Sequence, residues 1–139
     1  MSGMTAQAFN EIDVLLSDTI AIGQDLLNDI IQQINTIESF IPEKEYFWNL
    51  QLSSLSTDIT KFVELTTLIS KILSTKKKVS LPKVKESHIH LLFILKGINQ
   101  AQQKHDSLVL EDLIKYELKD NLTQWKIDFI PLIKRLLNT

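Results

Sequence analysis

The chain contains no cysteine, and only three glycines and three prolines occur among its 139 residues. The lack of cysteine excludes disulfides, zinc–thiolate and iron–sulfur sites, and thiol catalysis. Because β-rich folds carry more turn residues than this, the scarcity of glycine and proline favours a helical fold. It also leaves the chain without a glycine-rich loop that could hold a phosphate.

Arginine is nearly absent too, since Arg135 is the single one in the sequence. Arginine is the residue best suited to bidentate recognition of phosphate and carboxylate groups. With a single arginine, we do not expect a site of this kind. The chain also lacks the Gly-x-Ser-x-Gly motif of a nucleophilic serine. We therefore expect a protein that is not an enzyme, with no catalytic residue and no cofactor.

Long apolar runs are missing as well. The densest run, Ile89 to Leu95, falls far short of the roughly 20 residues that a membrane span requires. The first five residues lack the basic and apolar regions of a signal peptide. We expect a cytoplasmic protein, and the preference for lysine and isoleucine is typical of an AT-rich bacterial genome.

What the chain does contain is apolar residues at alternating spacings of three and four, the pattern of amphipathic helices. The pattern predicts an all-α fold in one domain of residues 1–139, with helices over about 5–40, 42–74, 84–104 and 107–137. Three of these helices have a clear apolar stripe: Phe9, Ile12, Leu16, Ile20, Leu27, Ile30, Ile34, Ile37 and Ile41 in the first; Trp48, Leu52, Leu55, Ile59, Phe62, Thr66, Ile69 and Leu73 in the second; Leu110, Ile114, Leu118, Leu122, Trp125, Phe129, Leu132 and Leu136 in the fourth.

Turn and capping residues set the expected ends of these helices. Thr5 is a candidate N-cap for the first helix, and Pro42 separates the first from the second. A loop is expected over 74–83, and Asp106 or Ser107 should cap the fourth helix. Four helices with short connections predict an antiparallel up-down-up-down four-helix bundle with long helices.

Three features of the helices leave room for irregularity. Gly23 lies inside the first helix and leaves open whether that helix is broken. Pro131 should kink the fourth helix near Ile127 or shorten it. The third helix is apolar around nearly its whole circumference, which predicts burial on most of its sides.

The histidines are the first candidates for a chemical site. His88 and His90 point in opposite directions on a helix, whereas Glu86 and His90, four apart, share a face. Metal sites in helical bundles use Glu-x-x-His pairs, and this chain has none. We expect no metal ligand, and histidines that are solvated or cap the third helix near its start. A ligand- or metal-binding bundle built around Glu86 and His90 is kept as one alternative.

Charge divides the chain into two unlike halves. Residues 1–74 contain ten acidic residues and three lysines, a net charge of −7, whereas residues 75–139 carry a net charge of +5. Opposite halves can attract one another within a bundle or across a homodimer. The lysines at 76–78, 83 and 85 have no interleaved aromatic residues, so we expect a solvated loop and no specific binding of nucleic acid.

Two short segments resemble known families. Leu92–Gly97 resembles the His-x-Leu-Lys-Gly signature of histidine phosphotransfer domains, which are also antiparallel four-helix bundles. Phe93 stands at the position of the phospho-accepting histidine, so the resemblance implies a scaffold without phosphotransfer. Residues 112–118, followed by Trp125, are similar to a segment of short uncharacterised helical proteins of low-GC bacteria, and this resemblance implies Tyr116 and Glu117 as its functional mark. The alternative interpretation is that Tyr116 is an anchor at the helix seam.

A surplus of apolar surface gives the functional hypothesis. Several helices carry a second apolar row beside the first: Leu26, Ile31, Val63, Ile72, Leu113 and Leu137. If the bundle does not cover these residues, they form an interface. We expect a non-enzymatic bundle that acts through contacts with a protein partner or with itself as a homodimer. The alternative is a chaperone for the export or assembly of a secreted or flagellar subunit.

Overall fold

The computed structural model describes the backbone of residues 2–40 and 45–137, and within these ranges the chain forms helices and no strand. Three long helices come first: α1 (Ser2–Phe40), α2 (Glu45–Thr75) and α3 (Pro82–Gln103). Residues 107–137 form one further long helical segment, named here the C-terminal helix. The predicted all-α class is confirmed, and no described helix is long and apolar enough to cross a membrane.

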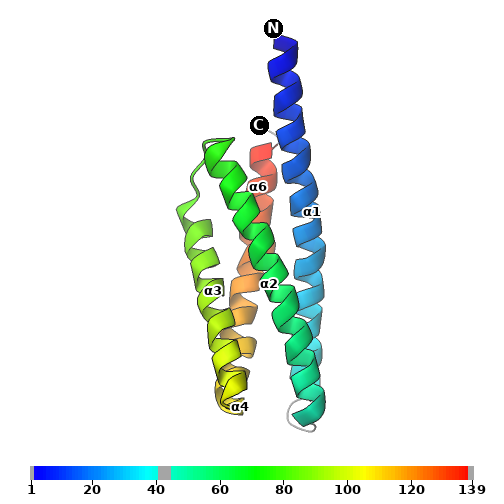
Figure 1. Cartoon of the computed structure of the whole chain (residues 1–139), viewed down its shortest axis with the longest axis vertical. Helices are drawn as coiled ribbons and strands as arrows, with labels where there is room; N and C mark the ends of the chain where they lie inside the picture. The colour runs from blue at the N-terminus through cyan, green and yellow to red at the C-terminus, as the bar shows by residue number, and fades with distance from the viewer. Residues whose placement is uncertain (1, 41–44, 138–139) are drawn as a thin grey trace.

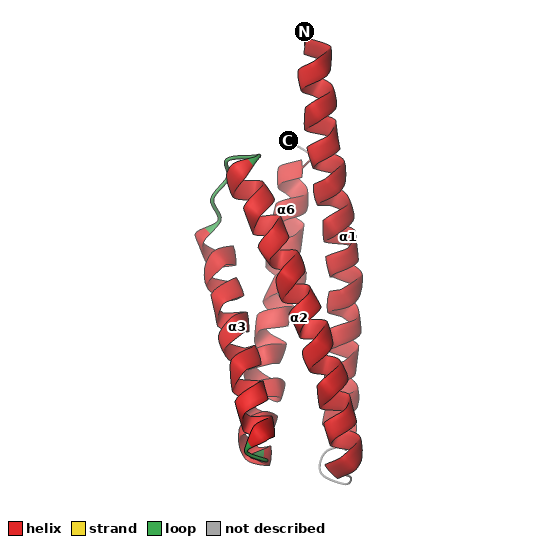
Figure 2. Cartoon of the chain, in the orientation of Figure 1, coloured by secondary structure: helices red, strands yellow, loops and turns green. Residues whose placement is uncertain are grey.

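The four long segments lie alongside one another (Figure 1). α2 contacts both α1 and α3, and the C-terminal helix contacts the same two helices. The loop over 76–81 lies at one end of the molecule and the turn over 104–106 at the other (Figure 2). Since each helix touches two neighbours, each can bury one continuous face.

The backbone of α1 shows where the first helix begins and whether it is broken at Gly23. The helix begins at Ser2, before Thr5, so Thr5 is not its N-cap. It continues without a break through Gly23. The predicted turn at Ile41 and Pro42 lies outside the described residues.

The apolar stripes predicted for the first two helices form the core. Their described members are buried, except Ile12, which is half-buried and packs against the core. The buried members are Leu16, Ile20, Leu27, Ile30, Ile34 and Ile37 from α1, and Leu52, Leu55, Ile59, Phe62, Thr66, Ile69 and Leu73 from α2. The side chains of Phe9, Ile41 and Trp48 lie outside the described part.

The C-terminal helix is not a regular α-helix. It consists of α4 (Ser107–Asp112), a π-helical turn η1 (Leu113–Leu118), α5 (Lys119–Gln124), a second π-helical turn η2 (Trp125–Phe129) and α6 (Ile130–Leu137). In the second π-helical turn, the N–H of Ile130 donates to the carbonyl of Trp125, five residues back. This irregularity falls where Pro131 was expected to act, but the helix continues to Leu137.

The π-helical turns change which residues face the core. A π-helical turn holds more residues than an α-helical turn, so it keeps residues four apart on one face. The stripe therefore runs through Ile114, Leu118 and Leu122 by steps of four, and all three are buried. After η2 the buried positions are Ile130 and Ile133, whereas the predicted Leu132 and Leu136 are only half-buried. That part of the predicted stripe was wrong.

An aromatic cluster fills the middle of the bundle. Trp125 is fully buried, and its ring meets Phe62 of α2 edge-on at 5.6 Å and Phe129 edge-on at 5.3 Å between centroids. Edge-to-face pairs of this kind add about 0.5–1.5 kcal/mol beyond their buried area. The prediction that Trp125 belongs to the apolar stripe of the fourth helix is confirmed.

The two described connections end their helices in different ways. α3 begins with Pro82 in its first turn. At the other end of α3, His105 takes a left-handed conformation with φ of 55°, and the N–H of Asp106 donates to the carbonyl of Ala101. Asp106 then caps α4, since its side chain accepts from the N–H of Val109 at 3.2 Å. The predicted choice between Asp106 and Ser107 is thereby decided.

Gly23 offers a direct test of this packing. Replacement by alanine should raise the free energy of unfolding by about 1 kcal/mol, because alanine is the better helix former and no other side chain or neighbouring helix lies within 4 Å of the added Cβ. Urea unfolding followed by circular dichroism measures the change. Gly97→Ala is the matched control: its Cβ would lie 3.1 Å from a methyl of Leu113, so its gain should be smaller. A Gly23→Ala protein less stable than the wild type would contradict this packing.

Candidate functional site

Polar contacts join α3 to the C-terminal helix inside the bundle. The side-chain amide of Asn121 donates to the backbone carbonyl of Ser87 at 3.0 Å and lies 3.2 Å from its hydroxyl. The same nitrogen lies 3.4 Å from Nδ1 of His90. Asn121 and Ser87 are both buried, and Oδ1 of Asn121 has no hydrogen-bond partner. This pair was not predicted from the sequence. The position of the polar residue Asn121 directly before Leu122 of the apolar stripe could have indicated a buried polar contact.

His88 makes the corresponding contact with α2. Its Nδ1 lies 2.8 Å from the hydroxyl of Thr66, and its Nε2 lies 3.3 Å from the hydroxyl of Thr67. Burial lowers the pKa of His88 below its ordinary value of 6.5, because desolvation disfavours the charged imidazolium. The side chain thus joins two helices chiefly as a neutral ring. His88 was expected to be solvated or to cap the helix, and that expectation was wrong.

These residues do not form a set of metal ligands. His88 and His90 contact different neighbours, as their spacing predicts, and Glu86 and His90 are both exposed. Within the described ranges, no group of three or more histidine or acidic side chains is placed to hold a metal ion. The threonine, serine and asparagine partners are neutral groups, which suit hydrogen bonding between helices.

The lysine-rich loop is only partly solvated. Lys76 and Lys78 are exposed, but Lys77 is half-buried and forms an ion pair with Asp13 of α1. The expectation of a solvated loop is therefore wrong for Lys77. Open grooves of about 680 and 450 Å³ lie on either side of the start of α3, and both are lined by Leu81 and Val84.

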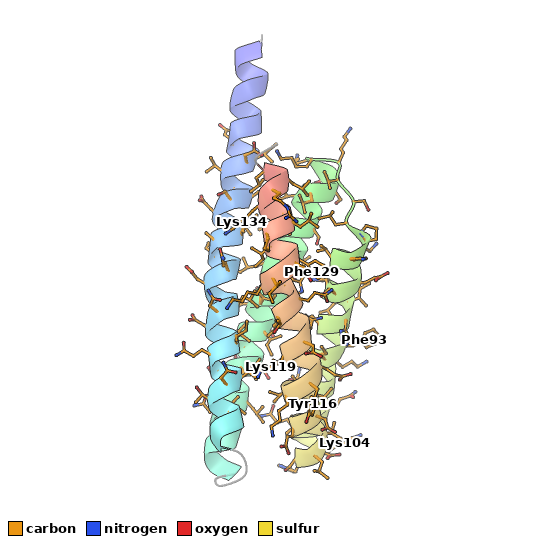
Figure 3. The ribbon with its side chains drawn as sticks, turned by 180° about the vertical axis from the view of Figure 1, so that it is seen from behind. Phe93, Lys104, Tyr116, Lys119, Phe129 and Lys134 are labelled. Atoms are coloured by element: carbon orange, nitrogen blue, oxygen red, sulfur yellow. The ribbon has the colours of Figure 1, made fainter. Side chains whose placement is uncertain are left out.

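The outer side of α3 carries a group of exposed apolar residues. Ile89, Leu92 and Phe93 are exposed, and Phe93 retains 67% of its accessible surface. Figure 3 shows Phe93 on the outside of the helix. The three residues, named here the α3 apolar face, lie opposite the buried residues Leu91, Ile94 and Ile98. The expectation that α3 is buried on most sides was wrong, since this face has no helix over it.

The second apolar rows predicted from the sequence pack against the core of the bundle. Val63 and Ile72 are buried, and the other members, Leu26, Ile31, Leu113 and Leu137, are half-buried against the core. The bundle itself therefore covers the rows from which the sequence predicted an interface. Tyr116, interpreted above as an anchor at the helix seam, is instead exposed (Figure 3). Glu117 is exposed too.

Comparisons with protein-family models, with curated proteins and with solved structures find no match to this chain. The resemblances of residues 92–97 to histidine phosphotransfer domains and of residues 112–118 to a bacterial helical family therefore stay predictions. The functional assignment has to be argued from the surface of the bundle.

The contact of His88 predicts a pH dependence of stability. The folded pKa is lowered, so the unfolded chain binds the proton more readily than the folded one. The contribution of neutral His88 to stability is complete above pH 6.5 and decreases as the pH falls toward the folded pKa. Urea unfolding from pH 8 to pH 5 should show a steeper loss for the wild type than for His88→Gln. Parallel curves for the two proteins would show that the contact does not couple to protonation.

Proposed function

We propose that this protein is a non-enzymatic helical bundle that acts through protein–protein contacts, with the α3 apolar face as its contact surface. The observation that carries the proposal is the exposure of Ile89, Leu92 and Phe93 within five residues of one helix. Scattered exposed apolar residues are normal, whereas a cluster of large ones is typical of an interaction site.

The energetics of this face favour docking. Complete burial of a large apolar side chain stabilises a contact by about 1.5–3 kcal/mol. Phe93 is two-thirds exposed in the free protein. Burial of this exposed part against a partner therefore stabilises the contact by about 1–2 kcal/mol. Aromatic residues lose few rotatable degrees of freedom on binding, which makes Phe93 the natural anchor of the face.

The rest of α3 supports the same role. The opposite side of the helix is held by apolar packing and by the contacts of Ser87 and His88, so the outer face rests on a fixed support. Lys85 and Lys96 lie exposed at the two ends of the face. An apolar centre with a charged rim is the common composition of a protein contact surface.

We extend the proposal to the architecture and the setting. The short turn at 104–106 and the contacts of α2 with both α1 and α3 support an antiparallel up-down-up-down bundle. The sequence features described above support a bacterial, cytoplasmic protein. A bundle of this kind offers its partner a rigid helical face.

Phe93→Ser should weaken partner binding without unfolding the protein. Truncation removes about 1–2 kcal/mol of contact energy, a weakening of roughly 5- to 30-fold, while exposed substitutions change stability by about 0.5 kcal/mol or less. The measurement is affinity capture from extract of the native host, with the wild-type chain and each variant as bait and thermal unfolding recorded in parallel.

Leu108→Ser is the matched control for that experiment, because Leu108 is 76% exposed on α4 and lies outside the α3 apolar face. It should retain the proteins that the wild type captures, copies of this chain included. The proposal is wrong if Phe93→Ser captures the same proteins in the same amounts, or if the wild type captures none.

A further inference from the structure

A second exposed stripe, on α1, matches the α3 apolar face. Residues 2–40 contain six acidic residues and no basic one. Spacings of four and three place a single row on the side of α1 opposite its buried stripe. This row, named here the α1 stripe, is entirely exposed and alternates acid with apolar residue at its start: Glu11, Leu15, Asp18, Ile22, Asp25 and Asp29. Leu15 and Ile22 keep 51% and 58% of their accessible surface.

The outer row of α3 has a lysine at each end and two apolar residues between them, so its charge is opposite to that of the α1 stripe. Lys85, Ile89, Leu92 and Lys96 follow one another at spacings of four, three and four, and all are exposed. Phe93 lies beside this row. The lysines are about 16 Å apart along the helix, and the ends of the α1 stripe, Glu11 and Asp29, about 27 Å, at the rise of 1.5 Å per residue. The α1 stripe is thus long enough to lie along the whole α3 row.

The charges of the α1 stripe and the α3 face determine which pairs of these surfaces can form a favourable contact. Two α1 stripes brought together would place acids against acids, and two α3 faces would place lysines against lysines, which costs energy at a contact. An α1 stripe against an α3 face instead brings the acids of α1 toward Lys85 and Lys96, while Leu15 and Ile22, on either side of Asp18, face the α3 apolar face. We propose that a second copy of this chain docks its α1 stripe on the α3 apolar face of the first.

The position of the two helices determines the kind of assembly. α1 and α3 lie at opposite edges of the molecule, with α2 and the C-terminal helix between them (Figure 1). One molecule therefore offers its two rows in different directions, and the contact is head-to-tail. Each added copy leaves one α1 stripe and one α3 face free, so the assembly grows into an open chain or closes into a ring.

This inference rests on the proposed contact role of the α3 apolar face, and two double variants test it. Leu92→Gln with Phe93→Gln removes two of the three apolar residues of the α3 face, and Leu15→Gln with Ile22→Gln removes both apolar residues of the α1 stripe. All four positions are exposed and glutamine is a good helix former, so both proteins should keep their thermal stability. Sedimentation velocity and light scattering at low salt, over a series of concentrations, give the mass.

The wild type should grow beyond a dimer with concentration, and growth should weaken at 500 mM salt, which screens the charged rims. Each double variant alone should be a monomer. Their equimolar mixture should form a dimer and nothing larger, because the mixture retains one intact α1 stripe and one intact α3 face that can meet.

Three results would overturn the inference. If the α1 double variant alone assembles as the wild type does, the α3 face packs on another copy of itself. If the mixture stays monomeric, the two rows do not meet. If the wild type is monomeric at several hundred micromolar, the partner is not a second copy. In that last case the contact role of α3 still stands when Phe93→Ser loses a different captured protein, and fails when no protein is captured.

Discussion

Burial of one apolar face from every helix is the constraint on which the structure depends. α1 alone has 39 residues and extends roughly 58 Å, a length that an isolated helix does not hold in water. Its residues from Leu16 to Ile37 gain stability only where α2 and the C-terminal helix cover them. The edge-on contacts of Trp125 with Phe62 and Phe129 fill the centre of this seam. Everything on the surface is positioned by that packing.

Polar contacts determine which side of α3 faces the core, because apolar packing alone does not. A helix that is apolar all round has no strong preference for which side faces inward. Ser87 and His88 supply one, because a rotation of α3 would separate them from Asn121 and Thr66 and leave polar groups buried without partners. Holding those two residues inward places Phe93 outward. The exposed face is therefore a consequence of the hydrogen bonds on the opposite side.

The helical class and most of the core could be predicted from spacing alone, because stripes of three and four residues leave little choice on α1 and α2. The spacing could not predict the outer side of α3, where apolar residues occupy every face and the deciding contacts come from other helices. The ion pair of Lys77 with Asp13 and the exposure of Tyr116 likewise depend on tertiary geometry. Ile133 was missed because the regular period was extended through a π-helical turn.

That turn has a consequence for how this chain can vary over evolution. A π-helical turn accommodates one residue more than the α-helical path around it. Loss of a single residue between Trp125 and Phe129 would restore a regular turn and leave the side chains before and after it on the faces they now occupy. The C-terminal helix thus contains a position at which its length can change by one residue while the register of the core is preserved. Within the regular α-helices, the same change would rotate every following side chain by about 100°.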